Sequence, residues 1–193
     1  MCSRKVRRER GMKSILISIK PKWCAKIALT EKTIEIRKTQ PKLNTPFKCY
    51  IYCTTVKALN LQDYCKLHAK TGGLIDDWNG KVIGEFVCDG ILRHCEMANA
   101  DIAEQEALVK REKIFKYSNG REVFGWHISN LVIYDKPRKI SEFWKAGKCE
   151  YATEDGCNYK YHCTRAGRLE RCGEQLTRPP QSWCYVEGIG NER

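Results

Sequence analysis

The stretch ILISIKPKWCAKIALTEKTIEIRK, residues 15–38, combines two strand patterns with a short helix pattern between them. The isoleucine-rich run Ser14–Ile19 is typical of a strand. The strand ends at Lys20-Pro21, because proline cannot donate a hydrogen bond to a sheet ladder. Pro21 suits the first position of a helix, and residues 21–29 (PKWCAKIAL) carry a short apolar stripe at helical spacing. The segment therefore predicts a strand, a helix and a strand in close succession.

The second strand pattern, Thr33–Lys38 (TIEIRK), alternates between polar and apolar residues. Successive side chains of a strand point to opposite faces, so we expect Ile34 and Ile36 to face the core. The opposite face is then polar, which makes it a candidate for binding. That face carries Thr33, Glu35 and Arg37.

Strand patterns recur along the rest of the chain, and helix patterns are few. Strands are predicted at residues 47–54, 81–87 (continuing towards Leu92), 123–134 and 183–186, helices at 59–70 and 98–115, turns at 72–73, 79–80 and 135–137, and a helical turn at 140–144. About five to seven short strands without a regular alternation of strand and helix favour an α+β fold. They predict a partly closed β-barrel with short flanking helices rather than a parallel sheet.

The chain of 193 residues is long enough for one well-filled core and short for two. We expect a basic disordered tail at residues 1–11, because this segment has no apolar period. A single barrel domain is predicted from residues 12–145 and 176–193. Residues 146–175 are rich in cysteine and poor in aliphatic side chains, so we expect them to form an insertion on the barrel.

The charge of the chain is strongly positive, with 35 Lys+Arg against 23 Asp+Glu and a formal net charge of +12. Lysine and arginine neutralise phosphates and release bound counterions, so RNA or a nucleotide is the first partner to test. No apolar run approaches the roughly 18 residues that span a bilayer. The basic N-terminus is also not followed by the apolar stretch of a signal peptide. We therefore expect a cytoplasmic protein that does not enter a membrane.

The chain contains 12 cysteines. Without an export signal, free thiols or metal ligands are expected rather than disulfides. Four of the cysteines lie in apolar strand-like runs, where cysteine behaves as a small hydrophobe. These four are Cys49, Cys53, Cys88 and Cys184.

A second group of cysteines lies in the predicted insertion, which has too few aliphatic residues to fold on apolar burial alone. A structural zinc ion would supply the missing folding energy, whereas no other motif requires a cofactor. The segment lacks the C-x2-C spacing typical of zinc sites, so free thiols in a loop are the alternative. The candidate ligands are Cys149, Cys157, Cys163 and Cys172, with His162 among them.

Residues 30–37 (TEKTIEIR) resemble the motif of ASCH-domain proteins, which is a glycine, one residue, lysine, two residues, glutamate, one residue and arginine. Lys32, Glu35 and Arg37 match this motif, and Thr30 stands in place of the glycine. Three later segments are similar to strands of phage and bacterial members of the family. They are KVIGEF at 81–86, GWHISNLVIYDKPRKISEF at 125–143 and RPPQSWCYVE at 178–187.

The resemblance implies a PUA-like barrel, a fold associated with RNA modification and with the binding of modified bases. One bacterial branch of the family hydrolyses the acetyl amide of N4-acetylcytidine and uses a lysine, a threonine and a glutamate. Lys32 matches that lysine, but Glu35 stands where the branch has its threonine. The glutamate of the branch lies in a segment that resembles residues 103–106, which implies a role for Glu106.

Lys32, Glu35 and Arg37 are the principal site candidates. The planar guanidinium of Arg37 suits a phosphate or a base edge, and Glu35 could orient it or accept from an amino group. Lys32 would supply positive charge, or act as a base if burial lowers its pKa. The alternative is an exposed cross-strand ion pair, which contributes little to stability.

Trp126 and His127 are further candidates in the predicted strand 123–134. Alternation places His127 on the same face as Ser129 and places Trp126 on the other face. Trp126 suits stacking on a base, and His127 suits proton transfer near neutral pH. The alternatives are a core tryptophan and a histidine that is only hydrogen-bonded.

Two functions follow from these residues. The first is an RNA-binding or modified-nucleotide-binding module with a basic cleft beside Lys32, Thr33, Glu35 and Arg37. The second is an amidohydrolase acting on N4-acetylcytidine or a related acylated nucleoside, with Lys32, Glu35 and Glu106 as catalytic groups. A third alternative is an adaptor that contacts an unknown protein partner through residues 146–175.

Overall fold

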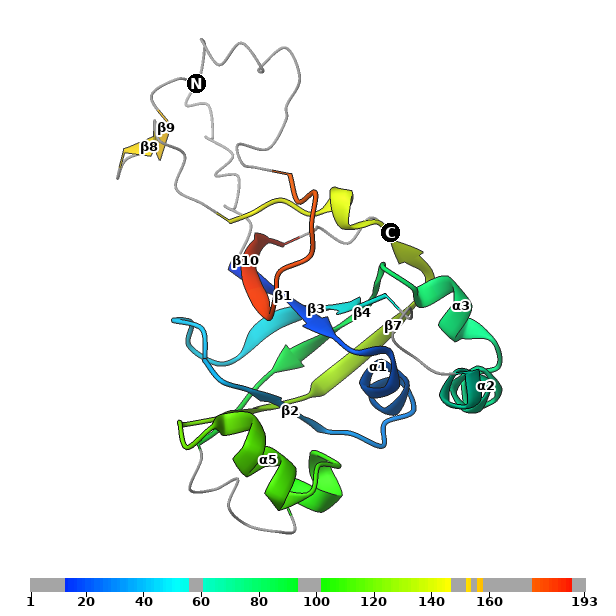
Figure 1. The fold of residues 1–193 in the computed structure, drawn as a ribbon. Coiled ribbons are helices and arrows are strands. Elements are labelled where there is room, and N and C mark those ends of the chain that lie inside the picture. Colours follow the sequence, from blue (N-terminus) through cyan, green and yellow to red (C-terminus); the bar gives the residue numbers. More distant parts are fainter. Residues whose placement is uncertain are drawn as a thin grey trace.

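The computed structural model describes residues 13–55, 61–93, 102–146, 152–153, 156–157 and 175–188. Two sheets account for most of the strands, one with the order β10-β1-β3-β4-β7 and one with the order β2-β6-β5. Figure 1 shows the larger sheet at the centre, with short helices beside it. The strands are β1 (Lys13–Ile19), β2 (Ile34–Arg37), β3 (Phe47–Cys53), β4 (Val82–Cys88), β5 (Ile91–Leu92), β6 (Phe124–His127), β7 (Ser129–Arg138) and β10 (Trp183–Glu187).

β1 lies inside the larger sheet and pairs with strands from both halves of the chain. It is parallel to β3 on one side and antiparallel to β10 on the other. A parallel pair needs a crossover connection, which here contains α1 (Pro21–Ala28) and then β2. The isoleucine-rich strand, the helix that begins at Pro21 and the following strand are therefore formed as predicted.

The two sheets are joined where long strands bend from one into the other. β4 is followed after Asp89 and Gly90 by β5, and β6 is followed after Ile128 by β7. Strands that switch sheets in this way make the corners of orthogonally packed β-structures. Within the described residues, hydrogen bonds do not close the strands into a barrel. The α+β class is thus confirmed, and the PUA-like barrel remains a prediction.

The helices are short and lie between the strands. α1 and α5 cover different parts of the sheets, whereas α2 and α3 lie together beyond α1 (Figure 1). Most of these helices fall within the segments predicted to be helical. The remaining elements are α2 (Leu61–Lys70), α3 (Leu74–Trp78), a π-helical turn (Ile102–Glu106), α5 (Arg111–Ser118) and a 3-10 turn (Ile140–Glu142).

Two local predictions were wrong. The turn predicted at residues 135–137 is absent, because β7 continues through Pro137 to Arg138. β7 is an edge strand of its sheet, where a proline without an N–H breaks no ladder. α3 occupies residues predicted to be a loop between two turns, and it buries Ile75 and Trp78.

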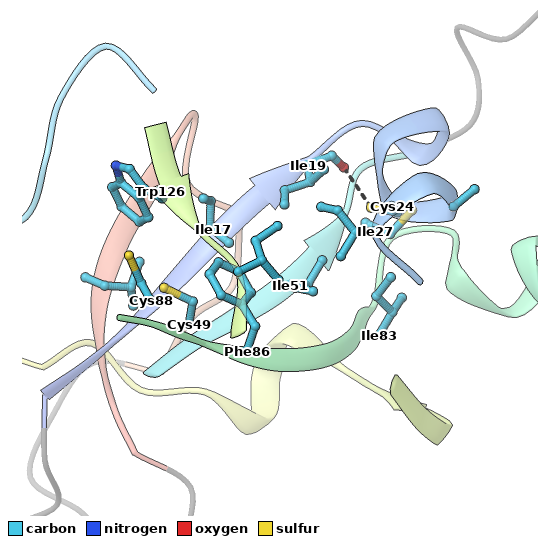
Figure 2. Close-up of a cluster of buried hydrophobic side chains, with 14 of the residues drawn as sticks. Ile17, Ile19, Cys24, Ile27, Cys49, Ile51, Ile83, Phe86, Cys88 and Trp126 are labelled. Atoms are coloured by element: carbon cyan, nitrogen blue, oxygen red, sulfur yellow. Dashed lines mark hydrogen bonds between the residues drawn. The ribbon is translucent and has the colours of Figure 1, made fainter. Parts of the chain in front are cut away.

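The main core lies between the strands of the larger sheet, α1 and β6. Figure 2 shows Cys24, Cys49 and Cys88 among the isoleucines and Trp126 of this cluster. Cys53 is also fully buried, and Cys184 is partly buried. Burial raises the pKa of Cys88 to about 12. Cys49, Cys53, Cys88 and Cys184 therefore pack as small hydrophobes, as expected.

The predicted tail at residues 1–11 lies outside the described residues, and so does most of the predicted insertion at 146–175. Of the insertion, the structure describes the backbone of a two-stranded hairpin of β8 (Ala152–Thr153) and β9 (Gly156–Cys157). The division into domains remains a prediction. Among the described residues, no helix combines the length and apolar character needed to cross a membrane.

Gly84 allows β4 and β7 to approach closely. A Cβ atom at this position would lie 2.3 Å from the Val132 carbonyl oxygen and 3.1 Å from Ile133 Cα, both on the backbone of β7. We expect Gly84→Ala to lower the free energy of unfolding by about 2 kcal/mol, because the strands must separate. Urea unfolding followed by tryptophan fluorescence measures the change.

Gly90→Ala is the matched control, since its Cβ would meet nothing nearer than His127 Cβ at 3.9 Å. Its free energy of unfolding should stay within about 0.5 kcal/mol of the unmodified chain. Equal stability of the two variants would contradict the close packing of β4 on β7.

Candidate functional site

The four residues of β2 are buried on both faces of the strand. Ile34 and Ile36 pack in a small cluster with Ile114 of α5. Glu35 and Arg37 point to the other side, where their charges act on the buried Cys24 of the main core. The predicted alternation of β2 is therefore present. Its polar face, however, lies in the interior and not along an open surface.

Lys32, Glu35 and Arg37 form one buried ionic cluster. Lys32 Nζ lies 3.5 Å from Glu35 Oε2, and Arg37 Nη2 lies 3.1 Å from Glu35 Oε1. The exposed fractions of the three residues are 2%, 6% and 9%. An exposed cross-strand pair, the alternative considered for these residues, is thereby excluded.

Backbone carbonyl groups hold the two cations in place. Lys32 Nζ donates to the Ala107 carbonyl at 2.6 Å, and Arg37 Nη2 donates to the Ser18 carbonyl at 2.7 Å. Lys32 Nζ also lies 5.0 Å from the centre of the Trp23 ring, within the range of a cation–π interaction. The cluster therefore connects β2 to β1, to α1 and to the segment before α5.

Two cations face one carboxylate, so the cluster carries an excess of positive charge. Burial lowers the pKa of Lys32 below its ordinary value, and Glu35 opposes this effect by stabilising the ammonium. Burial also raises the pKa of Cys24 well above its usual value. The neighbouring thiol thus adds no negative charge to balance the cluster near neutral pH.

Two N–H donors beside the cluster are buried without an acceptor in the described part of the chain. They are Arg37 Nε and Trp126 Nε1. Glu35 pairs with Trp126, and Arg37 pairs with Phe124, across the antiparallel strands β2 and β6. Directly opposed residues share a face, so both donors lie on the face that carries Glu35. Buried donors are nearly always hydrogen-bonded in proteins, which marks this face as incomplete.

Trp126 belongs to the core, as its alternative interpretation held. It is 0% exposed, and its ring centre lies 5.7 Å from that of Phe47 and 5.8 Å from that of Trp183. Figure 2 shows it beside Cys88. Its backbone position opposite Glu35 nevertheless brings it to the face of the cluster.

His127 lies on the other face of β6, opposite Ile34, as alternation predicts. Its Nδ1 atom is 2.6 Å from Asp89 Oδ1, and this contact lowers the pKa of Asp89. Both side chains are exposed by more than two fifths. The structure therefore brings together Lys32, Glu35, Arg37 and Trp126, and it leaves His127 outside this group.

Thr33 and Glu106 meet through their backbones. Thr33 N donates to the Glu106 carbonyl at 3.0 Å, and the Thr33 carbonyl accepts from Ile128 N at 2.8 Å. The Glu106 side chain is exposed. Residues 103–106, which resemble the catalytic segment of the amidohydrolase branch, thus meet Thr33, and the next residue, Ala107, contributes its carbonyl to the cluster.

Sequence patterns do not indicate that Trp23 and the carbonyl groups of Ser18 and Ala107 contact the cluster. Every residue has a carbonyl group, so a backbone acceptor leaves no signal in the sequence. Trp23 belongs to the apolar stripe predicted for residues 21–29, and its half-buried ring also packs against the main core.

The proposed zinc ligands Cys149, Cys163 and Cys172 lie outside the described residues, and so does the side chain of Cys157. Across the described ranges, no three His, Cys, Asp or Glu side chains gather in a way that would hold a metal ion. A structural zinc ion among the late cysteines remains a prediction.

The buried carboxylate of Glu35 should be important for stability, because its removal leaves two buried cations without a counter-charge. We expect Glu35→Gln to lower the free energy of unfolding by about 3 kcal/mol. The variant keeps the size of the side chain, so urea unfolding isolates the effect of the charge.

Glu31→Gln provides the control. Glu31 contacts Lys26 at 3.1 Å and Lys70 at 3.2 Å, but these side chains are at least one third exposed. Its loss should change the free energy of unfolding by less than about 1 kcal/mol. A Glu35→Gln variant as stable as Glu31→Gln would mean that the buried cluster is not electrostatically coupled.

Comparisons with known proteins identify similar solved structures only. No family model and no curated protein matches the chain. A tyrosine-to-phenylalanine mutant and a serine-to-alanine mutant of ZmASCH from Zymomonas mobilis are similar, each with a TM-score of 0.49 and 15% identity. Their alignments cover 89% of this chain and 88% and 87% of theirs.

The structure of ASCH from Zymomonas mobilis is similar with a TM-score of 0.45 and 15% identity, over 89% of this chain and 86% of that one. These proteins bear the name of the family that the sequence resembles. At this level of identity they say nothing of a ligand or a reaction.

Proposed function

We propose that this chain is an RNA-binding or modified-nucleotide-binding protein of the ASCH type, with a PUA-like fold. The nucleoside would be held by Glu35, Arg37 and Trp126, and Lys32 would supply positive charge. The observation that carries this proposal is the pair of buried donors, Arg37 Nε and Trp126 Nε1, that lack an acceptor on the face of Glu35.

A nucleobase offers the groups that this face lacks. Its carbonyl oxygens and ring nitrogens accept hydrogen bonds from guanidinium and indole N–H groups, while exocyclic amino groups donate to a carboxylate. Glu35 and Arg37 therefore present an acceptor and a donor side by side, at 3.1 Å from each other. Such a pair favours a ligand with both kinds of group on one edge, which a simple anion does not have.

The excess of positive charge favours a ligand that carries phosphate. The cluster has two cations against one carboxylate, and the whole chain has a formal net charge of +12. Arg37 is the most exposed member of the cluster, at 9%. We therefore expect the phosphate to lie towards Arg37 and the base to lie towards Trp126, since arginine is suited to bidentate phosphate contacts.

Trp126→Phe tests the proposal, because it removes the Nε1 donor and keeps an aromatic ring. We expect the affinity for the preferred ribonucleoside monophosphate to fall about tenfold, the effect of one lost hydrogen bond in a buried site. Isothermal titration calorimetry of the common ribonucleotides and of N4-acetylcytidine measures the affinity. Arg37→Lys, which keeps the charge but loses the planar fork, should weaken binding in the same direction.

Trp183→Phe is the matched control, since Trp183 Nε1 donates to Thr39 Oγ1 at 3.0 Å and so already has an acceptor. The affinity of this variant for the ribonucleoside monophosphate should equal that of the unmodified chain. The proposal is wrong if neither nucleotides nor RNA bind even at low salt. It is also wrong if Trp126→Phe binds the nucleotide as tightly as Trp183→Phe does. Unfolding free energies measured in parallel separate a loss of binding from a loss of structure.

The alternative function is an amidohydrolase acting on N4-acetylcytidine. One observation favours it, namely that burial lowers the pKa of Lys32, as a lysine acting as a base requires. Against it, Lys32 Nζ donates to the Ala107 carbonyl, and the Glu106 side chain is exposed. Lys32 Nζ also lies 3.5 Å from Glu35 Oε2, and this carboxylate stabilises the charged ammonium, which cannot act as a base.

We therefore expect no cytidine when the chain is incubated with N4-acetylcytidine and the products are separated by mass. A parallel incubation without protein corrects for spontaneous hydrolysis. Cytidine formed by the unmodified chain, and no longer formed by Lys32→Ala, would establish the amidohydrolase instead.

A further inference from the structure

The surface of α5 is basic and carries aromatic side chains. Residues 110–121 (KREKIFKYSNGR) contain five basic residues and one acidic residue. All five basic side chains are exposed, as is Lys38 at the end of β2. Phe115 is 69% exposed and Tyr117 is 41% exposed, which is unusual for side chains of this size.

The positive charge of this surface exceeds the negative charge beside it, which comes from the exposed Glu112 on α5 and from Glu122 just after the segment. In the part of the chain that the structure describes, neither Lys38 nor any of the five basic residues of 110–121 forms an ion pair. By contrast, Lys26 and Lys70 pair with Glu31, and Lys48 pairs with Glu85. Unbalanced cations on one helix face attract a polyanion through the release of its counterions.

Three residues of α5 share one side of the helix. Lys113, Lys116 and Tyr117 are separated by three and four residues, which places them next to one another along a helix surface. Lys38, which directly follows β2, joins them because its Nζ lies 4.7 Å from the centre of the Tyr117 ring. We call these four residues the α5 face.

Phe115 lies on the opposite flank of the helix from the α5 face. It is two positions away from both Lys113 and Tyr117, which corresponds to a rotation of roughly 200° around the helix axis. The exposed aromatic rings are thus divided by lysines and do not form one apolar patch. An apolar protein interface would need a continuous patch at its centre. Alternating cations and rings are instead typical of surfaces that follow single-stranded nucleic acid.

The α5 face adjoins the buried cluster through β2. Ile34 and Ile36 pack against Ile114 of α5 on one side of the strand, and Glu35 lies on the other side. Lys38 directly follows Arg37 and reaches Tyr117. Figure 1 shows α5 beside β2. A strand of RNA with one nucleotide at Arg37 would therefore meet the α5 face with its next nucleotides.

We propose that the α5 face (Lys38, Lys113, Lys116 and Tyr117) binds the nucleotides that flank the recognised one in single-stranded RNA. The lysines would neutralise phosphates, and the Tyr117 ring would stack on a base. This inference rests on the proposed function of the neighbouring cluster. It adds the class of ligand, which is an RNA strand rather than a free nucleoside.

Tyr117→Ala and Tyr117→Phe test the stacking. We expect Tyr117→Ala to weaken binding of a labelled oligouridine, about a dozen nucleotides long, by about tenfold in fluorescence anisotropy. Tyr117→Phe keeps the ring and should bind as the unmodified chain does. Affinity for mononucleotides should be unchanged in both variants, because the cluster is intact.

Lys113→Gln combined with Lys116→Gln tests the phosphate contacts. The slope of log affinity against log salt should become shallower by about 1.4, as expected for two lost contacts to a single strand. Lys66→Gln combined with Lys136→Gln removes the same charge from exposed sites on α2 and β7, and it should keep the slope.

The inference is wrong if Tyr117→Ala binds oligouridine normally, or if the control pair loses as much of the slope as the α5 pair. It is also wrong if polyglutamate binds as tightly as the RNA and is insensitive to Tyr117→Ala, because the face would then suit an acidic protein. Loss of nucleotide binding in Trp126→Phe with normal oligouridine binding in Tyr117→Ala would retain the proposed function and reject the α5 face.

Discussion

The carboxylate of Glu35 contacts the cations of Lys32 and Arg37 inside the protein, and the position of β2 depends on this match of charges. A buried charge without a partner is very costly, so the polar face of β2 can lie inward only while all three side chains are present. The hydrogen bond from Arg37 to the Ser18 carbonyl then holds β2 against β1. The hydrogen bond from Lys32 to the Ala107 carbonyl holds it against the segment before α5. The same arrangement leaves the Nε donor of Arg37 without an acceptor among the described residues. The cluster that holds β2 in place is thus also the one that we propose as the binding site.

Much of the fold follows from local patterns, and its arrangement in space does not. Isoleucine-rich and alternating segments identify β1, β2 and β3 almost to the residue, because side-chain periodicity is a local property. Depth is not local. The alternation of β2 assigns residues to two faces, but it cannot tell that both faces are covered. The bends at Gly90 and Ile128 leave no clear pattern either, so one predicted strand became β6 and β7 in different sheets.

The sequence predicts which residues form the candidate site, but not how they are arranged in space. The spacing of Lys32, Glu35 and Arg37 identified the cluster through its resemblance to a family motif. Its burial could not be predicted, because Ala107 is 75 residues away from Lys32 along the chain. Alternation correctly separated Trp126 from His127, but only the pairing with β2 determines which of them lies on the face of Glu35. The α5 face was missed for a related reason, since its unpaired charges are evident only when the exposed acids have been located.

The two surfaces of β2 and α5 suit different parts of recognition. In complexes with nucleic acids, phosphate contacts supply affinity that is independent of sequence, whereas contacts to base edges supply specificity. In the proposed complex, the exposed lysines of the α5 face would make the first kind of contact, and the buried Glu35 and Arg37 would make the second. β2 connects them, because Arg37 ends the strand inside the protein and Lys38 leaves it towards Tyr117. A ligand that contacts both must pass round the end of this strand. A flexible single strand can do so, whereas a rigid duplex cannot place one base in the interior without first unstacking it.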